Sequence, residues 1–430
     1  MSKSTNRRDF LKTTGAVAAG CWVAGGAFAR GGESPNERLR MASIGIGGKG
    51  GSDSQDAAQH GDMVAICDVD QNRLAGALKR FPGAKGYADF RKMLDEMGDK
   101  IDAVTVSTPD HMHAPASLMA MRMGIHCFCQ KPLTRTIYEA RLVGQVARER
   151  KLATQMGNQG TAGDNLRRSA HWLKNGAIGT VRELHIWTDR AKGWWPQGVE
   201  RPAPSTPPDY LPWDLWLGVA PERPYAEGYH PFKWRGWWDF GTGALGDIAC
   251  HVVSMPFMGL DLRNPISAVA ETSGHNKDSF PEWSIITYEF AATDARPAVK
   301  LVWYDGGKLP PKELLGGRDP SPKGGSLAIG DKGILLNDQL LDGGEPVEVD
   351  FPHSPGHFEE WIRAIKTGEP AMSNFPDYAG PLTESMLLGN LAVWCGEKVE
   401  WDAAAMKVKN VQGLESLIKP TYRKGYTLDT

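Results

Sequence analysis

The sequence predicts an α/β protein whose first half is a doubly wound, mostly parallel sheet. Two observations lead to this prediction: short apolar runs alternate with helical stretches between residues 39 and 158, and a glycine-rich turn follows the first run. Strands that alternate with helices in this way form a parallel sheet covered by helices on both faces. The chain has 430 residues, which is enough for two domains with separate cores.

The elements of the first half follow in order from this alternation. Strands are predicted within LRMASIGIGG (39–48), MVAICDVD (63–70), IDAVTVSTP (101–109), IHCFCQKP (125–132) and LATQMGN (152–158). Helices are predicted over QNRLAGALKRF (71–81), HAPASLMAMRMG (113–124) and TIYEARLVGQVARERK (136–151). We therefore expect one domain over residues 36–157 and a second over 158–430.

A glycine motif joins the first strand to the first helix. Gly45, Gly47 and Gly50 form G-x-G-x-x-G, which permits a tight turn, close approach of the backbone to a pyrophosphate, and close helix packing. Asp68 ends the second strand 18 residues after Gly50, where a carboxylate can accept hydrogen bonds from the adenosine ribose. Together they predict a Rossmann dinucleotide-binding domain. Because Asp68 would repel a 2′-phosphate, NAD is favoured over NADP.

The first 29 residues predict an export signal. Arg7 and Arg8 precede Phe10, Leu11 and Lys12, and a small-residue apolar stretch then ends at an A-x-A-like cleavage site, 27–29. Such a twin-arginine signal peptide predicts passage through the Tat export machinery to the periplasm. AAGC, ending at Cys21, is a minor alternative as a lipoprotein cleavage site.

Composition narrows the function classes. The formal charge is −2, and removal of residues 1–29 takes away four basic residues and one acid, giving −5. This balance argues against a nucleic-acid surface. We expect no membrane span, since no later apolar run reaches the necessary length. The five cysteines after residue 29 are scattered and odd in number, so we expect free, buried thiols.

The motifs STPDHMH (107–113), QKP (130–132) and GTGALGDIACH (241–251), with the glycine turn, resemble the glucose–fructose oxidoreductase/inositol dehydrogenase (Gfo/Idh/MocA) family. The resemblance extends to the late segments YAGPLTESMLLGNLAVWCGEKVEWD and YRKGYTL. It implies that a C-terminal α+β domain with a large, mostly antiparallel sheet follows the Rossmann domain. Because an exported enzyme cannot draw on the cytoplasmic nicotinamide pool, we expect the NAD to be tightly bound. We also expect a homo-oligomer formed through the C-terminal sheet.

The resemblance also implies site residues. The cofactor-binding positions are Gly45, Ile46, Gly47, Gly48, Lys49, Gly50, Asp68, Ser107, Thr108, Pro109, His113, Gln130, Lys131 and Asn158. Lys131 matches the family lysine that lies near the nicotinamide and the substrate hydroxyl, and the bond before Pro132 is expected to be cis. Gln130 stands where the family usually has Glu. His111 and His113 lack accompanying acidic or cysteine ligands, so we expect no metal site.

Asp247 and His251 are the further catalytic candidates, with Lys131. At i and i+4 of a helix, their side chains project from the same face. Oxidation of a secondary alcohol needs a base for the hydroxyl proton, and a histidine suits this near neutral pH. Without the nucleotide-binding half, a buried structural histidine would be the preferred interpretation. The family order Lys, Asp, His reverses that preference.

Residues 187–238 hold eight of the fifteen tryptophans and nine prolines, which predicts a long, ordered insertion. We expect most of these rings to be structural, either as the insertion's own core or as a subunit contact. The predicted substrate contacts are Gln159, His230, Trp237 and Trp238, with Arg235 a weaker candidate.

Three functions follow from these observations. The first is an exported NAD(P)-dependent oxidoreductase acting on a secondary hydroxyl of a sugar, glycoside or cyclitol. The second is a glycosidase of the same family that uses NAD for transient oxidation and elimination. The third is a non-catalytic carbohydrate-binding protein with the same fold, because fold alone does not imply activity.

Overall fold

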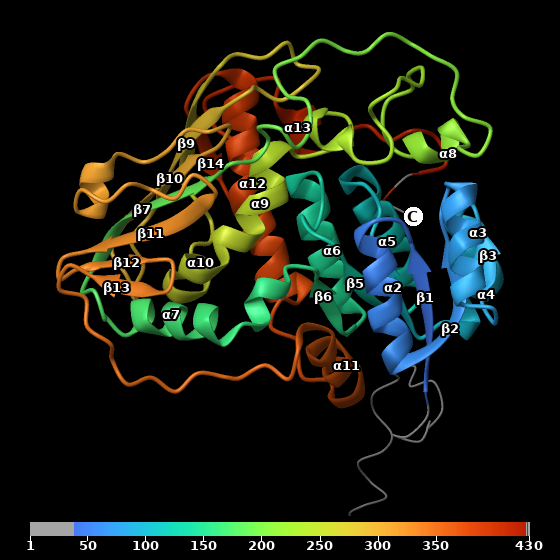
Figure 1. Ribbon diagram of the computed structural model, residues 1–430, viewed down its shortest axis with the longest axis horizontal. Helices are drawn as coiled ribbons and strands as arrows, with labels where there is room; N and C mark the ends of the chain where they lie inside the picture. The colour runs from blue at the N-terminus through green and yellow to red at the C-terminus, as the bar shows by residue number, and fades with distance from the viewer. Residues whose placement is uncertain (1–37, 427, 429–430) are drawn as a thin grey trace, which may run out of the picture. The chain divides into compact units, whose positions relative to one another are not determined.

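The structure, a computed structural model, describes residues 38–426 and residue 428 (Figure 1). The predicted signal peptide, its cleavage site and Cys21 lie outside the described residues. The described chain contains two sheets, one in each half of the sequence.

The first sheet has six parallel strands in the order β3-β2-β1-β4-β5-β6. Its strands are β1 (Leu39–Ile44), β2 (Gly61–Cys67), β3 (Lys85–Tyr87), β4 (Ala103–Val106), β5 (His126–Cys129) and β6 (Thr154–Met156). Its helices are α2 (Lys49–His60), α3 (Gln71–Arg80), α4 (Phe90–Met97), α5 (His113–Arg122) and α6 (Ile137–Glu149), with 3-10 turns η1 (Gly98–Lys100), η2 (Asp110–Met112) and η3 (Gln159–Ala162). This is the predicted Rossmann arrangement, in which the strand order reverses direction between β1 and β4.

Local sequence explains where these helices begin. The side chain of Asp70 accepts hydrogen bonds from the backbone N–H groups of Asn72 and Arg73, which caps α3. Thr136 and Glu139 form a reciprocal capping box at the start of α6. The strand β3 and the helix α4 were not among the predicted elements. A strand of three residues, such as β3, is too short to show a hydrophobic period.

The second sheet has nine strands in the order β13-β12-β11-β7-β10-β9-β8-β14-β15. They are β7 (Val181–Thr188), β8 (Ser267–Thr272), β9 (Ser284–Phe290), β10 (Val299–Tyr304), β11 (Gly324–Gly330), β12 (Ile334–Leu336), β13 (Gln339–Leu341), β14 (Val399–Asp402) and β15 (Lys407–Val408). Only the β7–β10 pair among them is parallel. The expectation of a large, mostly antiparallel sheet is confirmed.

Helices of the second half join the two sheets. They are α7 (Asp164–Lys174), α8 (Trp213–Leu217), α9 (Gly243–Val252), α10 (Ser254–Leu260), α11 (His357–Thr367), α12 (Gly380–Cys395) and α13 (Glu415–Ile418), with η4 (Lys233–Gly236), η5 (Lys312–Leu315) and the π-helical η6 (Phe375–Ala379). The long helix α12 packs against α6 of the first half and α9 of the second (Figure 1), and it also contacts β8. One hydrophobic core therefore runs from the first sheet to the second.

The tryptophan- and proline-rich insertion has its own aromatic core. It contains α8 and η4, and its buried cluster includes Trp216, Tyr229, Trp234, Trp237 and Phe240. The rings of Trp213 and Trp216 stack 4.8 Å apart with an angle of 13° between their planes. Most rings of this tract are therefore structural, as the sequence predicts.

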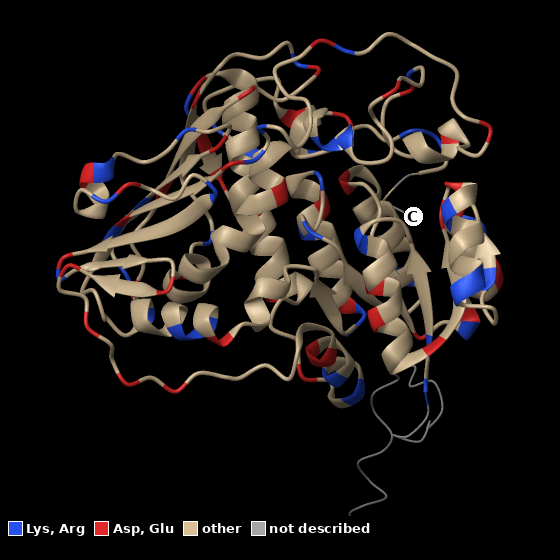
Figure 2. Cartoon of the chain, viewed as in Figure 1, with Lys and Arg blue, Asp and Glu red and all other residues tan. Residues whose placement is uncertain are grey.

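Figure 2 shows Lys and Arg interspersed with Asp and Glu along the helices in that view. Within residues 38–426, no single helix is long and apolar enough to cross a membrane. The pair α9 and α10, bent by 57°, meets the criterion by length and composition only.

Candidate cofactor and catalytic site

A cavity of about 490 Å³ opens at the carboxyl end of the parallel sheet. Its lining follows the ends of β1, β2, β4 and β5, at the point where the strand order reverses, and insertion residues complete it. The predicted site residues that line it are Gly45, Gly47, Gly48, Lys49, Asp68, Ser107, Thr108, Pro109, Gln130, Lys131, Gln159 and His230. Residues from five separate segments, 45–49, 68, 107–109, 130–131 and 159, thus meet in one cavity with His230 of the insertion.

The glycine turn leaves no room for side chains at two positions. Gly45 has φ +78°, and a Cβ there would lie 2.6 Å from the carbonyl oxygen of Ser107. A Cβ on Gly50 would lie 2.0 Å from the carbonyl oxygen of Gly45, so this glycine packs α2 against β1 rather than facing the cavity. Ile46, predicted as a cofactor contact, also lies outside the lining: its side chain is in the core and its N–H binds Asp68. The N-terminus of α2 then faces a space suited to a phosphate.

Asp68 stands at the end of β2 with its carboxylate at the cavity. One oxygen accepts a hydrogen bond from the N–H of Ile46 at 3.0 Å and the other from the N–H of Asp70 at 2.9 Å. Burial raises the pKa of Asp68, and these backbone donors and the nearby Arg73 oppose the effect. The carboxylate is therefore fixed in orientation by the two N–H groups.

His230, a predicted substrate contact, lies at this same end of the cavity. Its Nε2 is 3.0 Å from the carboxylate of Asp70, which follows β2, and Tyr210 of the insertion accepts a hydrogen bond from the N–H of Gln71. These contacts place His230 beside Asp68. His230 lines the cavity and attaches the insertion to its Asp68 side, and its contact with substrate stays a prediction.

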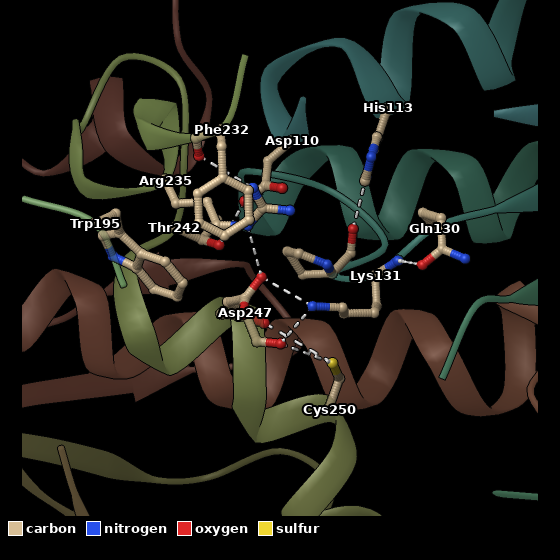
Figure 3. Close-up of polar contacts among 12 residues, drawn as sticks. Asp110, His113, Gln130, Lys131, Trp195, Phe232, Arg235, Thr242, Asp247 and Cys250 are labelled. Atoms are coloured by element: carbon tan, nitrogen blue, oxygen red, sulfur yellow. Dashed lines mark hydrogen bonds and ion pairs between the residues drawn. The ribbon is translucent and has the colours of Figure 1, made fainter. Parts of the chain in front are cut away.

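Lys131, Arg235 and Asp247 form the charged centre of the site (Figure 3). The Lys131 ammonium is 2.8 Å from Oδ1 of Asp247 and also donates to its backbone carbonyl at 3.0 Å. The Nε of Arg235 donates to the same Oδ1 at 3.1 Å. Burial alone would raise the pKa of Asp247, but Lys131 and Arg235 together hold it below its usual value. Asp247 is therefore an ionised carboxylate that fixes two cations.

The two cations line the cavity, and Asp247 lies behind them. Arg235 is held by aromatic faces, with its guanidinium 4.2 Å from the ring centre of Trp234 and 4.5 Å from that of Phe232. The sequence ranked Arg235 only as a weaker candidate, because its approach to Asp247 depends on how the insertion folds. The bond between Lys131 and Pro132 is cis, as expected.

Asp110 is a further ionisable group of this cavity, and the sequence analysis did not select it. It lines the cavity, is 2% exposed, and accepts a hydrogen bond from the hydroxyl of Thr242 at 2.7 Å. Burial raises its pKa to about 7, although Thr242 and Arg235 oppose the shift. Its place within STPDHMH was the signal that could have identified it.

His251 follows Asp247 by one turn of α9, as predicted. Its side chain is partly exposed, and among the described residues it does not belong to the lining of the 490 Å³ cavity. Burial lowers the pKa of His251 to about 4, with Lys131 adding to the effect and Asp247 opposing it. At neutral pH the imidazole is therefore uncharged.

His113 and Asn158 are placed differently from their predicted roles as cofactor contacts. The two ring nitrogens of His113 lie 2.7 Å and 2.8 Å from the carbonyl oxygens of Pro132 and Thr108. Asn158 accepts a hydrogen bond from Ser373 at 2.6 Å and is 1% exposed. Neither lines the cavity. Both are corrected to supports, because their polar atoms are already bound within the protein.

The predicted substrate contacts Trp237 and Trp238 are also corrected. Trp237 is 2% exposed in the aromatic core of the insertion. Trp238 stacks on Phe280 with 3.7 Å between ring centres and donates its indole N–H to the carbonyl of Ser279. Their closeness to α9 in sequence suggested substrate contact, but the chain turns both rings into the core.

Two models of one family match the chain. The first, described as the oxidoreductase family with an NAD-binding Rossmann fold, matches residues 39–158. The second, the C-terminal alpha/beta domain of that family, matches residues 174–296. A signal sequence of the twin-arginine translocation pathway matches residues 4–21, which indicates export to the periplasm.

Curated relatives with related names match over part of their length. The levoglucosan dehydrogenase of Pseudarthrobacter phenanthrenivorans is 24% identical over 48% of this chain and 45% of its own length. An inositol 2-dehydrogenase of Pseudarthrobacter chlorophenolicus is 39% identical over 23% of this chain and 29% of its own. A glycosyl hydrolase family 109 protein of a Shewanella species is 30% identical over 36% and 39%. The chain therefore spans less than half of each of these relatives.

Solved structures share the fold over most of the chain. The WlbA dehydrogenase from Bordetella pertussis, crystallised with NADH and UDP-GlcNAcA, has a TM-score of 0.61 at 15% identity, covering 85% of this chain and 99% of its own. GenD2 from gentamicin A biosynthesis, crystallised with NAD, has a TM-score of 0.59 at 18% identity, covering 86% and 99%. With the two family matches and the Rossmann strand order, these findings show that the chain belongs to the Gfo/Idh/MocA oxidoreductase family.

Proposed function

We propose that this protein is an exported, NAD-dependent oxidoreductase that acts on a secondary hydroxyl of a sugar, glycoside or cyclitol. The observation that carries the proposal is that Lys131, held by Asp247, lines the same cavity as the glycine turn and Asp68. One end of the cavity thus has the groups that recognise a dinucleotide. The other has a fixed ammonium that can bind an alcohol oxygen.

The residues present fit a nicotinamide dinucleotide. The turn at Gly45–Gly48 and the N-terminus of α2 would hold the pyrophosphate, and the fixed carboxylate of Asp68 would accept hydrogen bonds from the adenosine ribose. Gln130 and Lys131 would lie at the nicotinamide end. When bound, the nicotinamide supplies a two-electron acceptor for hydride.

Each catalytic residue then has a specific task. Lys131 binds the substrate oxygen and stabilises negative charge on it as its proton leaves. Asp247 keeps the ammonium in place and accepts a hydrogen bond from Arg235 at the same time. His251, which lies on α9 one turn after Asp247 and outside the lining described above, is the proposed proton acceptor.

The preference for NAD over NADP rests on Asp68. Replacement of Asp68 by alanine should weaken NAD binding by about 1–3 kcal/mol, since a charged hydrogen-bond acceptor is lost. The same change should improve NADP binding relative to NAD, because the repulsion of the 2′-phosphate disappears. Calorimetric titration of both nucleotides measures this, and an unchanged NAD affinity would remove Asp68 from the site.

A second candidate function is a glycosidase that oxidises the sugar transiently. Oxidation at one carbon acidifies the adjacent C–H and permits elimination of the aglycone, after which water adds to the resulting double bond and the oxidation is reversed. Asp110 favours this candidate, because a buried carboxyl with a pKa of about 7 could protonate a leaving group. The relative named as a glycosyl hydrolase family 109 protein supports it as well.

One experiment distinguishes the two. Purified protein is first assayed for bound nicotinamide nucleotide and then mixed with free sugars, inositols and glycosides. Net formation of reduced nucleotide with free sugars supports the oxidoreductase. Release of aglycone without net reduction supports the glycosidase. Binding of sugars with neither reaction would instead support a non-catalytic member of the fold.

A further inference from the structure

A buried carboxylate behind the cavity holds three of its lining side chains. Asp53, on the second turn of α2, is 0% exposed. Its Oδ1 lies 2.7 Å from the ammonium of Lys49, and its Oδ2 accepts hydrogen bonds from Ser107 at 2.7 Å and from Gln130 at 2.9 Å. These three partners all line the cavity, whereas Asp53 does not.

The side-chain amide of Gln130 is fixed at both ends. Its Nε2 donates to Asp53, and its Oε1 accepts a hydrogen bond from the backbone N–H of Lys131 at 3.3 Å. The side chain of Lys131 in turn reaches Asp247. A continuous series of contacts therefore leads from the buried carboxylate to the ammonium of the site.

This arrangement requires a neutral donor at position 130. An ionised carboxylate only accepts hydrogen bonds, so a Glu at this position would face Asp53 across about the present 2.9 Å with no proton between them. Two like charges at that distance in a buried site are strongly unfavourable. The neutral amide of Gln130 is thus matched to the buried carboxylate of Asp53.

We propose that Asp53 and Gln130 form a carboxylate–amide pair, in which Asp53 supplies the negative charge and Gln130 the amide that positions Lys131 and the nicotinamide end of the cavity. Asp53 is in this account a positioning residue that acts through Lys49, Ser107 and Gln130. The statement about the nicotinamide rests on the proposed function.

The test compares charge placement at the two positions. Gln130→Glu should weaken NAD binding by about tenfold or more, because it puts two carboxylates together. Gln130→Met, which removes the amide without adding charge, should have a smaller effect. Asp53→Asn combined with Gln130→Glu should recover affinity to within about threefold of the original protein, since a donor again faces a carboxylate.

Nucleotide affinity is measured by calorimetry, and folding is checked by the thermal midpoint of each variant. Asp56→Asn, on the same helix but outside these contacts, is the control and should leave NAD affinity within about twofold. The proposed carboxylate–amide pair is refuted if Gln130→Glu binds NAD as tightly as Gln130→Met. It is also refuted if the double variant binds NAD no more tightly than Gln130→Glu. If the unaltered protein binds no nicotinamide nucleotide, the proposed function itself fails.

Discussion

At the scale of single residues, the site depends on two cations, Lys131 and Arg235, that share the carboxylate of Asp247. Lys131 and Asp247 are 116 positions apart in the chain, and the lysine meets the same Oδ1 as Arg235. Sequence motifs could identify Lys131 and Asp247 because the family order marks them. They ranked Arg235 only as a weaker candidate and did not select Asp110 or Asp53, because the contacts of these three residues depend on neighbours that the fold brings close.

Asp110 gives a pH-dependent test at this scale. Its pKa is about 7 in the fold, above the ordinary value of 3.8, so the fold prefers the protonated form. The stability that it contributes is complete below about pH 4 and is lost as the pH rises through about 7. Asp110→Asn should therefore gain stability relative to the original protein between these values.

Thermal unfolding of both proteins across this pH range measures the effect. Asp305 is a second buried carboxyl, whose pKa is raised to about 6. Because both proteins contain Asp305, its contribution cancels in the difference between their free energies of unfolding, and the effect of Asp110 remains. A stability difference that does not change with pH would show that Asp110 is not protonated preferentially in the fold.

At the scale of elements, the sequence predicted the helix α9 but not its contacts with the first half of the chain. The helix forms where GTGALGDIACH predicted it, with Asp247 and His251 one turn apart. Its connection to the first half through Thr242 and Asp110 depends on residues 132 positions apart, which no local pattern reveals. The insertion shows the same limit: its aromatic content predicted a core, but not which rings enter it.

The role of His251 on this helix is tested by substitution. His251→Ala should lower turnover by about 10²–10⁴-fold, the usual cost of losing a general base, with little change in NAD affinity or thermal midpoint. Because the pKa of His251 is about 4, activity in the original protein should persist as the pH falls from neutral and decline only near that value. An active but destabilised His251→Ala protein would mean that this histidine is structural.

At the scale of the whole molecule, the alternation of strands and helices predicted the parallel sheet because periodicity is a local property. The nine-stranded sheet was predicted by resemblance alone, since its pairs join residues far apart in the chain. The expected homo-oligomer through that sheet stays a prediction. The twin-arginine signal fits a protein that must fold around a cofactor before it leaves the cytoplasm.

Export is the prediction that belongs to this scale. Replacement of Arg7 and Arg8 by lysine should retain the precursor in the cytoplasm, folded and loaded with nucleotide. Cell fractionation followed by nucleotide analysis of the retained protein measures both properties. Export of the double variant at the normal level would show that the paired arginines do not direct it.

The central claim is that Lys131 operates on a substrate hydroxyl beside a bound nicotinamide, and Lys131→Met tests it most directly. The nucleotide-loaded protein and this variant are mixed with the substrate found in the sugar and glycoside panel, and the near-ultraviolet absorbance of reduced nicotinamide is followed in single turnover. We expect reduction in the original protein and a loss of about 10²-fold or more in the variant at equal nucleotide occupancy. Reduction at an undiminished rate in Lys131→Met would contradict the account.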